Sequence, residues 1–225
     1  CALNNRKDMK LAILAVLTVM TVLPSHAFAM HISEGILPAP WAGLWFLVSL
    51  PFVWFGLRTL RERSRSQPEF KAMVGLLGAA VFVISCMPVP VPTAGTCSHP
   101  CGTGIAAVFI GPAVTVVITS VALTLQALFL AHGGLSTLGA DILSMGILGA
   151  YVGYAVFRAG CRLRLNPVAA AFLAGLLSDW ATYTMTSVEL ATALHNGQSV
   201  LTMFGAILVA FIPTQLPLGI FEGGV

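Results

Sequence analysis

Long, nearly uncharged apolar runs are the feature that most constrains what this chain can fold into. They lie at residues 42–57, 72–88, 104–131, 139–157, 168–190 and 199–221. A helix needs about 20 apolar residues to cross the ~30 Å hydrocarbon core of a bilayer, whereas strands of a membrane barrel alternate apolar and polar residues. Only 8% of the residues are charged, against roughly 25% in a soluble domain. The sequence therefore predicts an all-α, polytopic protein surrounded by a lipid bilayer.

The run at 104–131 is too long for one crossing and too short for two. As a single helix it would extend about 42 Å at 1.5 Å per residue. The pair Gly111-Pro112 offers a break, so we expect a short helix ending near Ile110 and a longer one from Ala113 to Ala131. Irregular backbone at membrane depth is tolerated only where protein or a cavity surrounds it. With this broken helix, about seven transmembrane helices are expected.

The N-terminal segment has the pattern of a secretory signal peptide. Residues 6–29 combine a basic start, a short apolar stretch and the Ala-x-Ala of Ala27 and Ala29. Met9 is the expected initiator. Cleavage after Ala29 would separate residues 1–29 from a single integral-membrane, metal-binding domain, 30–225, that begins with the free amine of Met30. The alternative is an uncleaved first transmembrane helix.

Basic residues between the apolar runs predict the orientation. They gather at 58–71 and 158–164, and both clusters are expected on the cytoplasmic side by the positive-inside rule. The loop from Pro88 to Gly102, whose prolines and glycines favour irregular backbone, then faces outward. Met30, His31 and His99 therefore fall on the same, extracytoplasmic face.

An N-terminal amine followed by histidine can chelate a divalent metal ion. Met30 would supply its α-amine, His31 its deprotonated amide and imidazole nitrogens, and His99 a fourth nitrogen. Such nitrogen sets suit Ni²⁺ and Cu²⁺ and accommodate Co²⁺. Two other interpretations stay open: His31 as a polar residue just outside the membrane, and His99 as a loop histidine bonded to backbone groups.

Other polar residues are weaker candidates. Cys97 and Cys101 flank His99 and could be thiolate ligands or a disulfide. His132, before a Gly-Gly pair, is expected to be a loop or capping histidine. Asp141 and Asp179 lie within apolar runs, where ionisable side chains usually face the bundle interior; we expect structural roles, as hydrogen-bond acceptors or helix-packing partners.

Several function classes lack their residues. The chain has no G-x-x-x-x-G-K-[ST], H-E-x-x-H or G-x-S-x-G, the motifs of nucleotide-binding loops and common hydrolases. Its basic residues form no stripe with interleaved aromatic residues, so no nucleic-acid partner is expected. Five cysteines, an odd number, do not indicate a disulfide framework.

The chain resembles the CbiM/NikM family, the substrate-binding membrane subunits of energy-coupling factor (ECF) transporters for cobalt and nickel, and is most similar to its cobalt branch. The matching segments are MHISEGILPAPWAGLWF (30–46), SHPCGTGIAAVFIGP (98–112), LQALFLAHGGLSTLGADILSMGILG (125–149) and IPTQLPLGIFEG (212–223). The resemblance implies a metal site formed by Met30, His31 and His99. It also implies no permanently bound cofactor, because Co²⁺ or Ni²⁺ is the substrate.

The family resemblance further implies a capture subunit of an importer that supplies cobalt for cobalamin biosynthesis, in the plasma or inner membrane of a prokaryotic cell. It would not be an enzyme, since ATP hydrolysis would belong to CbiO-like ATPases. These would act through a CbiQ-like coupling protein, with a small CbiN-like subunit as a further partner. The alternatives are a nickel-specific NikM-type subunit, an ATP-independent permease and an intramembrane enzyme using Asp141, Asp179 or the histidines.

The sequence departs from the family pattern at a few positions. Ser33 stands where the family often has methionine, and Asp141 and Ser144 where it often has asparagine. The pair Cys97 and Cys101 is also not general in the family. Relatives usually continue beyond the position of Val225, so a short last helix or a truncated chain is expected.

Overall fold

The computed structural model describes residues 28–29, 32–87, 89–91 and 96–225. Most of the predicted signal segment therefore lies outside the described residues, as do Met30 and His31. Signal cleavage and the division into 1–29 and 30–225 stay predictions.

The described part is built almost entirely from helices, which confirms the all-α prediction. They are α2 (Ala39–Ser66), α3 (Pro68–Ser85), α4 (Thr103–Ile110), α5 (Pro112–Phe129), α6 (Leu138–Asp141), α7 (Ala150–Arg162), α8 (Pro167–Leu194) and α9 (Val200–Gly224). A π-helical segment, η1 (Ile142–Gly149), joins α6 to α7 in one continuous helix. Among the described residues, five helices are long and apolar enough to cross a membrane: α2, α3, α5, the α6–η1–α7 helix and α9. The number of seven crossings stays a prediction.

The chain breaks at Gly111, as its sequence predicts. Helix α4 ends at Ile110 and α5 begins at Pro112. Gly111 has φ 86°, a conformation that glycine adopts readily, and proline suits the first turn of a helix because it has no N–H to leave unsatisfied. The Nη1 atom of Arg63 donates a hydrogen bond of 2.7 Å to the Ile110 carbonyl oxygen. The end of α4 is thereby fixed to the basic end of α2.

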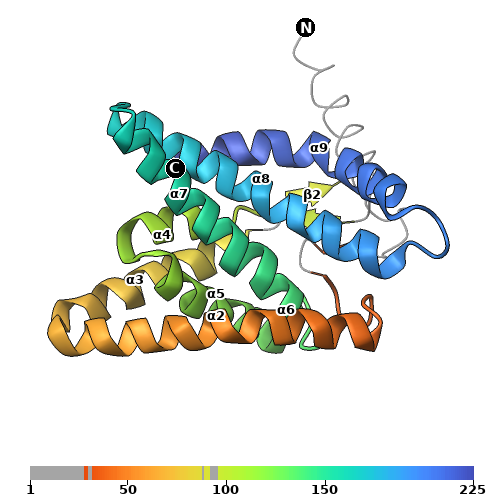
Figure 1. Ribbon diagram of the computed structural model, residues 1–225, viewed down its shortest axis with the longest axis horizontal. Coiled ribbons are helices and arrows are strands. Elements are labelled where there is room, and N and C mark those ends of the chain that lie inside the picture. The colour runs from red at the N-terminus through yellow and green to blue at the C-terminus, as the bar shows by residue number, and fades with distance from the viewer. Residues whose placement is uncertain (1–27, 30–31, 88, 92–95) are drawn as a thin grey trace, which may run out of the picture.

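The helices lie along the long axis of the molecule. Helix α2 runs along one side and α8 and α9 along the other, and the shorter helices fill the space between them (Figure 1). The α2–α3 and α7–α8 connections lie at the same end (left in Figure 1), and the two basic clusters flank them on α2, α3 and the end of α7. The start of α2 and the α8–α9 connection lie at the opposite end. Both basic clusters therefore lie at one end of the bundle, and the side of the membrane that this end faces stays a prediction.

The region 88–102, expected to be irregular, contains short strands instead. β2 (Val89–Val91) pairs antiparallel with β3 (Thr96–Ser98), and β1 (Phe28–Ala29) pairs parallel with β3, giving the order β1-β3-β2. The prolines explain the difference. A residue before proline is driven out of the helical region into extended backbone, and Val89 and Val91 both precede proline.

Small residues let α4 lie deep among its neighbours. A Cβ atom added to Gly104 of α4 would lie 2.6 Å from the Ser178 Cβ of α8, and one added to Gly153 of α7 would lie 2.7 Å from the Gly104 Cα. These distances are too short for any side chain. The three helices therefore meet nearly backbone to backbone, and the loop that precedes α4 is enclosed by protein.

Candidate metal site

The segment that follows His31 is fixed by a distant carboxylate. The backbone N–H of Ile32 donates a 2.9 Å hydrogen bond to Oδ1 of Asp141. The Ile32 side chain is buried in a small apolar cluster with Leu37, Ala42 and Ala140. Both polar and apolar contacts therefore hold the chain immediately after the predicted metal-binding residues.

Thr137 makes the second hydrogen bond to the backbone of Ile32. Its hydroxyl donates to the Ile32 carbonyl oxygen and lies 3.4 Å from Oδ2 of Asp141. Asp141 and Thr137, one helical turn apart, thus satisfy both backbone groups of Ile32. The expectation that Asp141 serves as a hydrogen-bond acceptor is confirmed.

A further contact joins the same two regions at the surface. The Ser136 backbone N–H donates to Oε2 of Glu34 at 3.2 Å, and hydrogen bonds from Ser136 lower the pKa of the Glu34 carboxyl. A Cβ atom on Gly134 would lie 2.7 Å from both the backbone N and the Cα of Glu34, so only glycine allows this approach. The loop 130–137 therefore lies directly against the N-terminal segment.

His99 lies buried in the loop before α4. Its Nδ1 atom is 3.1 Å from the Pro100 carbonyl oxygen, and its ring centroid is 5.2 Å from that of His132. Burial, with a smaller contribution from His132, lowers the pKa of His99 to about 3. The imidazole is therefore neutral near pH 7, which is the form that binds metals.

Polar side chains from α8 and α9 hold the His99 loop. The Tyr183 hydroxyl is 3.1 Å from the Ser98 hydroxyl and donates to the His99 carbonyl oxygen at 3.3 Å. The Gln215 side-chain amide also donates to the Ser98 hydroxyl. These bonds give the loop a defined position between the two longest helices on that side.

His132 is one of two residues in this region whose importance the sequence does not indicate; the other is Glu222. It was expected to be a loop or capping histidine, and it does lie in the loop after α5, where its N–H donates to the Gln126 carbonyl oxygen at 3.2 Å. Ala131 adopts φ 49° to make this turn. The turn brings the His132 ring against the His99 ring. The Gly-Gly pair after His132 predicts a turn, but it does not predict this contact with His99.

Asp179 does not join the histidines. Its carboxylate lies with the Cys101 thiol and the Glu222 carboxylate, all three ligand atoms within 4.8 Å of one another. Cys101 carries a free thiol, so the disulfide alternative is wrong for this residue; the Cys97 side chain lies outside the described residues. The sequence does not indicate Glu222, because it follows an apolar run beside a Gly-Gly pair, which is typical of a helix end.

The sequence matches a known family over most of the chain. A family model described as "Cobalt uptake substrate-specific transmembrane region", CbiM, matches residues 31–225. The chain belongs to the CbiM family. The resemblance stated from the sequence is thereby confirmed, and the family match begins at His31.

Individual CbiM relatives and solved structures agree. The chain is 59% identical over 204 residues to a "Cobalt transport protein CbiM" of Geobacter sulfurreducens, covering 91% of this chain and 59% of that protein. It is 58% identical to one from Sorangium cellulosum, covering 86% of each. A crystal structure of a truncated transition metal transporter matches with a TM-score of 0.74 and 25% identity, over 86% of this chain and 92% of that one.

Proposed function

We propose that the chain is the substrate-capture subunit of an ATP-driven, ECF-type importer for cobalt. The observation that carries the proposal is the fixed position of Ile32. Asp141 and Thr137 hold it, and the loop that leads to Thr137 also carries His132, whose ring faces His99. The residue after His31 is thus anchored beside the loop that carries His132, which supports a site shared by His31 and His99.

The proposed ligands are the Met30 amine, the His31 amide and imidazole nitrogens, and a His99 nitrogen. This set requires Met30 to be the first residue, so it requires cleavage after Ala29. The neutral state of His99 supports the proposal because no proton has to leave that ring before a metal binds. The names of the similar proteins favour cobalt over nickel.

The chain provides selectivity and its partners provide energy. The sequence has no G-x-x-x-x-G-K-[ST] motif of a nucleotide-binding loop. We therefore assign ATP hydrolysis to separate CbiO-like ATPases that act through a CbiQ-like membrane protein. The bound ion would be released inward when these partners rearrange the bundle. The importer would supply cobalt for cobalamin synthesis across a prokaryotic cell membrane, with the mature N-terminus outside.

The decisive experiment combines N-terminal sequencing with metal analysis of the purified protein. We expect the mature chain to start at Met30 and the His31→Ala variant to lose Co²⁺ from this site. His195→Ala is the control, because His195 follows the end of α8 and is not a proposed ligand. A different mature start, or equal cobalt content in His31→Ala and wild type, would contradict the proposal.

A further inference from the structure

A second group of metal-binding side chains lies deeper in the bundle. Cys101 comes from the loop before α4, Asp179 from the middle of the 28-residue helix α8, and Glu222 from the last turn of α9. All three are buried, and their Sγ and carboxylate oxygen atoms lie within 4.8 Å of one another. Three separate elements thus direct ligand atoms to one point.

The hydrogen bonds around this group are incomplete. Glu222 accepts from the Cys101 N–H at 2.6 Å through Oε2 and from the Gly102 N–H at 2.9 Å through Oε1. Both oxygens of Asp179 are buried and have no hydrogen-bond partner. The indole N–H of Trp180, the next residue in the chain, donates to the Gln215 carbonyl oxygen at 3.1 Å. Asp179 is therefore directed into the group with both oxygens available.

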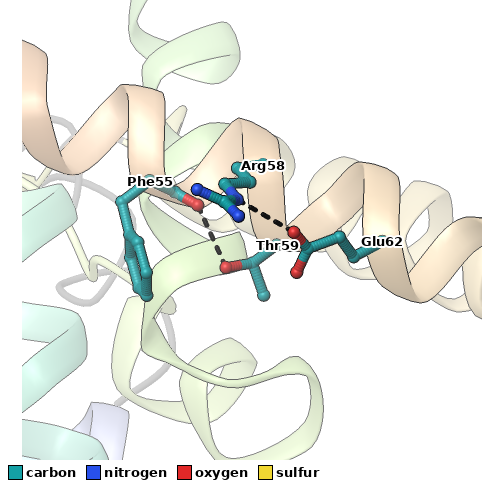
Figure 2. Close-up of polar contacts among 4 residues, drawn as sticks. All are labelled: Phe55, Arg58, Thr59 and Glu62. Carbon is teal, nitrogen blue, oxygen red and sulfur yellow. Dashed lines mark hydrogen bonds and ion pairs between the residues drawn. The ribbon is translucent and has the colours of Figure 1, made fainter.

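No described cation balances these acids. Within the ranges that the structure covers, the ion pair recorded joins Arg58 to Glu62 on α2 (Figure 2), far from Asp179 in sequence. Removing a carboxylate from water costs several kcal/mol unless an opposite charge or hydrogen bonds compensate for it. A bound cation would supply the missing positive charge.

We propose that Cys101, Asp179 and Glu222 form a second binding site, for a divalent transition-metal ion. Ligand atoms bonded at about 2.0–2.3 Å to one tetrahedral ion lie roughly 3–4 Å apart. Shifts of about 1 Å would therefore close these side chains on an ion. One thiolate and two carboxylates suit Co²⁺ or Zn²⁺ better than Ca²⁺ or Mg²⁺, which take oxygen ligands. Three protein ligands leave a fourth position for water, as in sites that exchange a ligand.

The depth of the site indicates its role. Helix α4 extends about 12 Å from Thr103 to Ile110, where Arg63 marks the basic end of the bundle. Cys101 lies just before the start of α4, and the side chains of Cys101, Asp179 and Glu222 are all buried. The site therefore lies inside the protein, and Cys101 is only two residues from His99 in the chain. Given the proposed function, the site is a transit position that receives the ion from the outer site. The existence of the site does not depend on that function.

The test uses the full chain with Cys101 as its only cysteine. Serine replaces the remaining four cysteines, which are Cys1, Cys86, Cys97 and Cys161. Adding Co²⁺ to this protein in detergent under reducing conditions should produce the near-ultraviolet charge-transfer absorption of a cobalt thiolate. Cys101→Ser should abolish the band, and Asp179→Asn and Glu222→Gln should each weaken Co²⁺ binding at this site at least tenfold.

Two controls make the result specific. Glu189→Gln removes another buried carboxylate of α8, outside the group, and should leave the band unchanged. His31→Ala and His99→Ala should lose the outer-site ion and keep the band. If His31→Ala keeps its cobalt content while the band persists, the proposed function fails and this site stands.

The proposal is overturned by any of three results. The folded protein with Cys101 alone shows no cobalt–thiolate band; the band persists at equal affinity in both Asp179→Asn and Glu222→Gln; or His31→Ala abolishes it, which would place the thiolate in the outer site. Asn and Gln preserve side-chain size, so these two variants decide the question if Cys101→Ser does not fold.

Discussion

At the scale of single residues, Asp141 connects two parts of the chain that are 109 residues apart. Replacing Asp141 by alanine leaves the buried Ile32 N–H without its acceptor, which costs about 1–3 kcal/mol. We expect Asp141→Ala to weaken Co²⁺ binding roughly tenfold or more, measured by titration calorimetry. The reason is a less ordered N-terminal segment, since Asp141 is not itself a proposed ligand.

Asp141→Asn is the matched control for this prediction. Asparagine keeps a side-chain oxygen at the same position, and the family resemblance indicates that asparagine is common there. We expect Asp141→Asn to bind Co²⁺ within about threefold of wild type, because an acceptor oxygen remains for Ile32. Equal losses in the two variants would show that the negative charge, and not the hydrogen bond, matters.

The depressed pKa of His99 makes the metal-free protein sensitive to acid. When the His99 loop opens, the ring regains its ordinary pKa near 6.5 and binds a proton, whereas the buried ring beside His132 binds one only near pH 3. Stability from this group is therefore complete above pH 6.5 and is lost as the pH falls toward 3. The free energy of unfolding should fall by about 1.4 kcal/mol per pH unit within that range.

Thermal unfolding of the metal-free protein in detergent at pH 7 and pH 5 measures this effect. We expect His99→Gln to flatten the pH dependence, since the titrating ring is gone, and His195→Gln to retain it. An identical pH dependence in His99→Gln and wild type would assign the acid sensitivity to other groups.

At the scale of elements, the contact of α4, α7 and α8 depends on glycine. A methyl group on Gly153 would lie 2.7 Å from the Gly104 Cα and 3.2 Å from the Ser178 Cβ. Backbone atoms cannot move aside as a flexible side chain can. We expect Gly153→Ala to lower the free energy of unfolding by about 1–3 kcal/mol, measured by thermal or denaturant unfolding in detergent.

Gly43 on α2 is the control for that substitution. No atom lies within 4 Å of a Cβ atom placed there, and alanine is favoured over glycine in a helix by about 1 kcal/mol. Gly43→Ala should therefore leave stability unchanged or raise it slightly. Destabilisation of equal size at both positions would rule out helix crowding as the cause.

Local backbone structure could be predicted from the sequence, whereas contacts between residues far apart in the chain could not. The break at Gly111-Pro112 follows from two adjacent residues, and the helices follow from apolar runs. By contrast, the approach of His132 to His99 and the grouping of Asp179 with Cys101 depend on how helices cross. The strand at Val89–Val91 could have been expected from the alternating prolines, whose effect on their neighbours is local.

At the scale of the whole molecule, the surface has two kinds of region: exposed apolar side chains along the helices and basic side chains gathered at one end. Large apolar side chains such as Trp54, Leu76 and Leu201 are mainly exposed, as expected for helices in contact with lipid. Arg58 and Glu62, whose ion pair is drawn in Figure 2, belong to the second half of α2, toward the end with the basic clusters. The bundle therefore has an apolar girdle and one basic end.

This polarity leads to a prediction about orientation that cysteine labelling can test. Cys161 is exposed at the end of α7 between Arg158 and Arg162, so we expect a membrane-impermeant maleimide to label it only in inside-out vesicles. Leu135, 51% exposed in the loop 130–137, lies against the N-terminal segment.

In a chain whose other cysteines are replaced by serine, Leu135→Cys should be labelled only in right-side-out vesicles. The reason is that the basic clusters are expected on the cytoplasmic side by the positive-inside rule, while the loop beside Glu34 lies at the opposite end of the bundle. Cys161 labelled from outside, or both positions labelled from the same side, would reverse the orientation and place the proposed cobalt site on the wrong face for uptake.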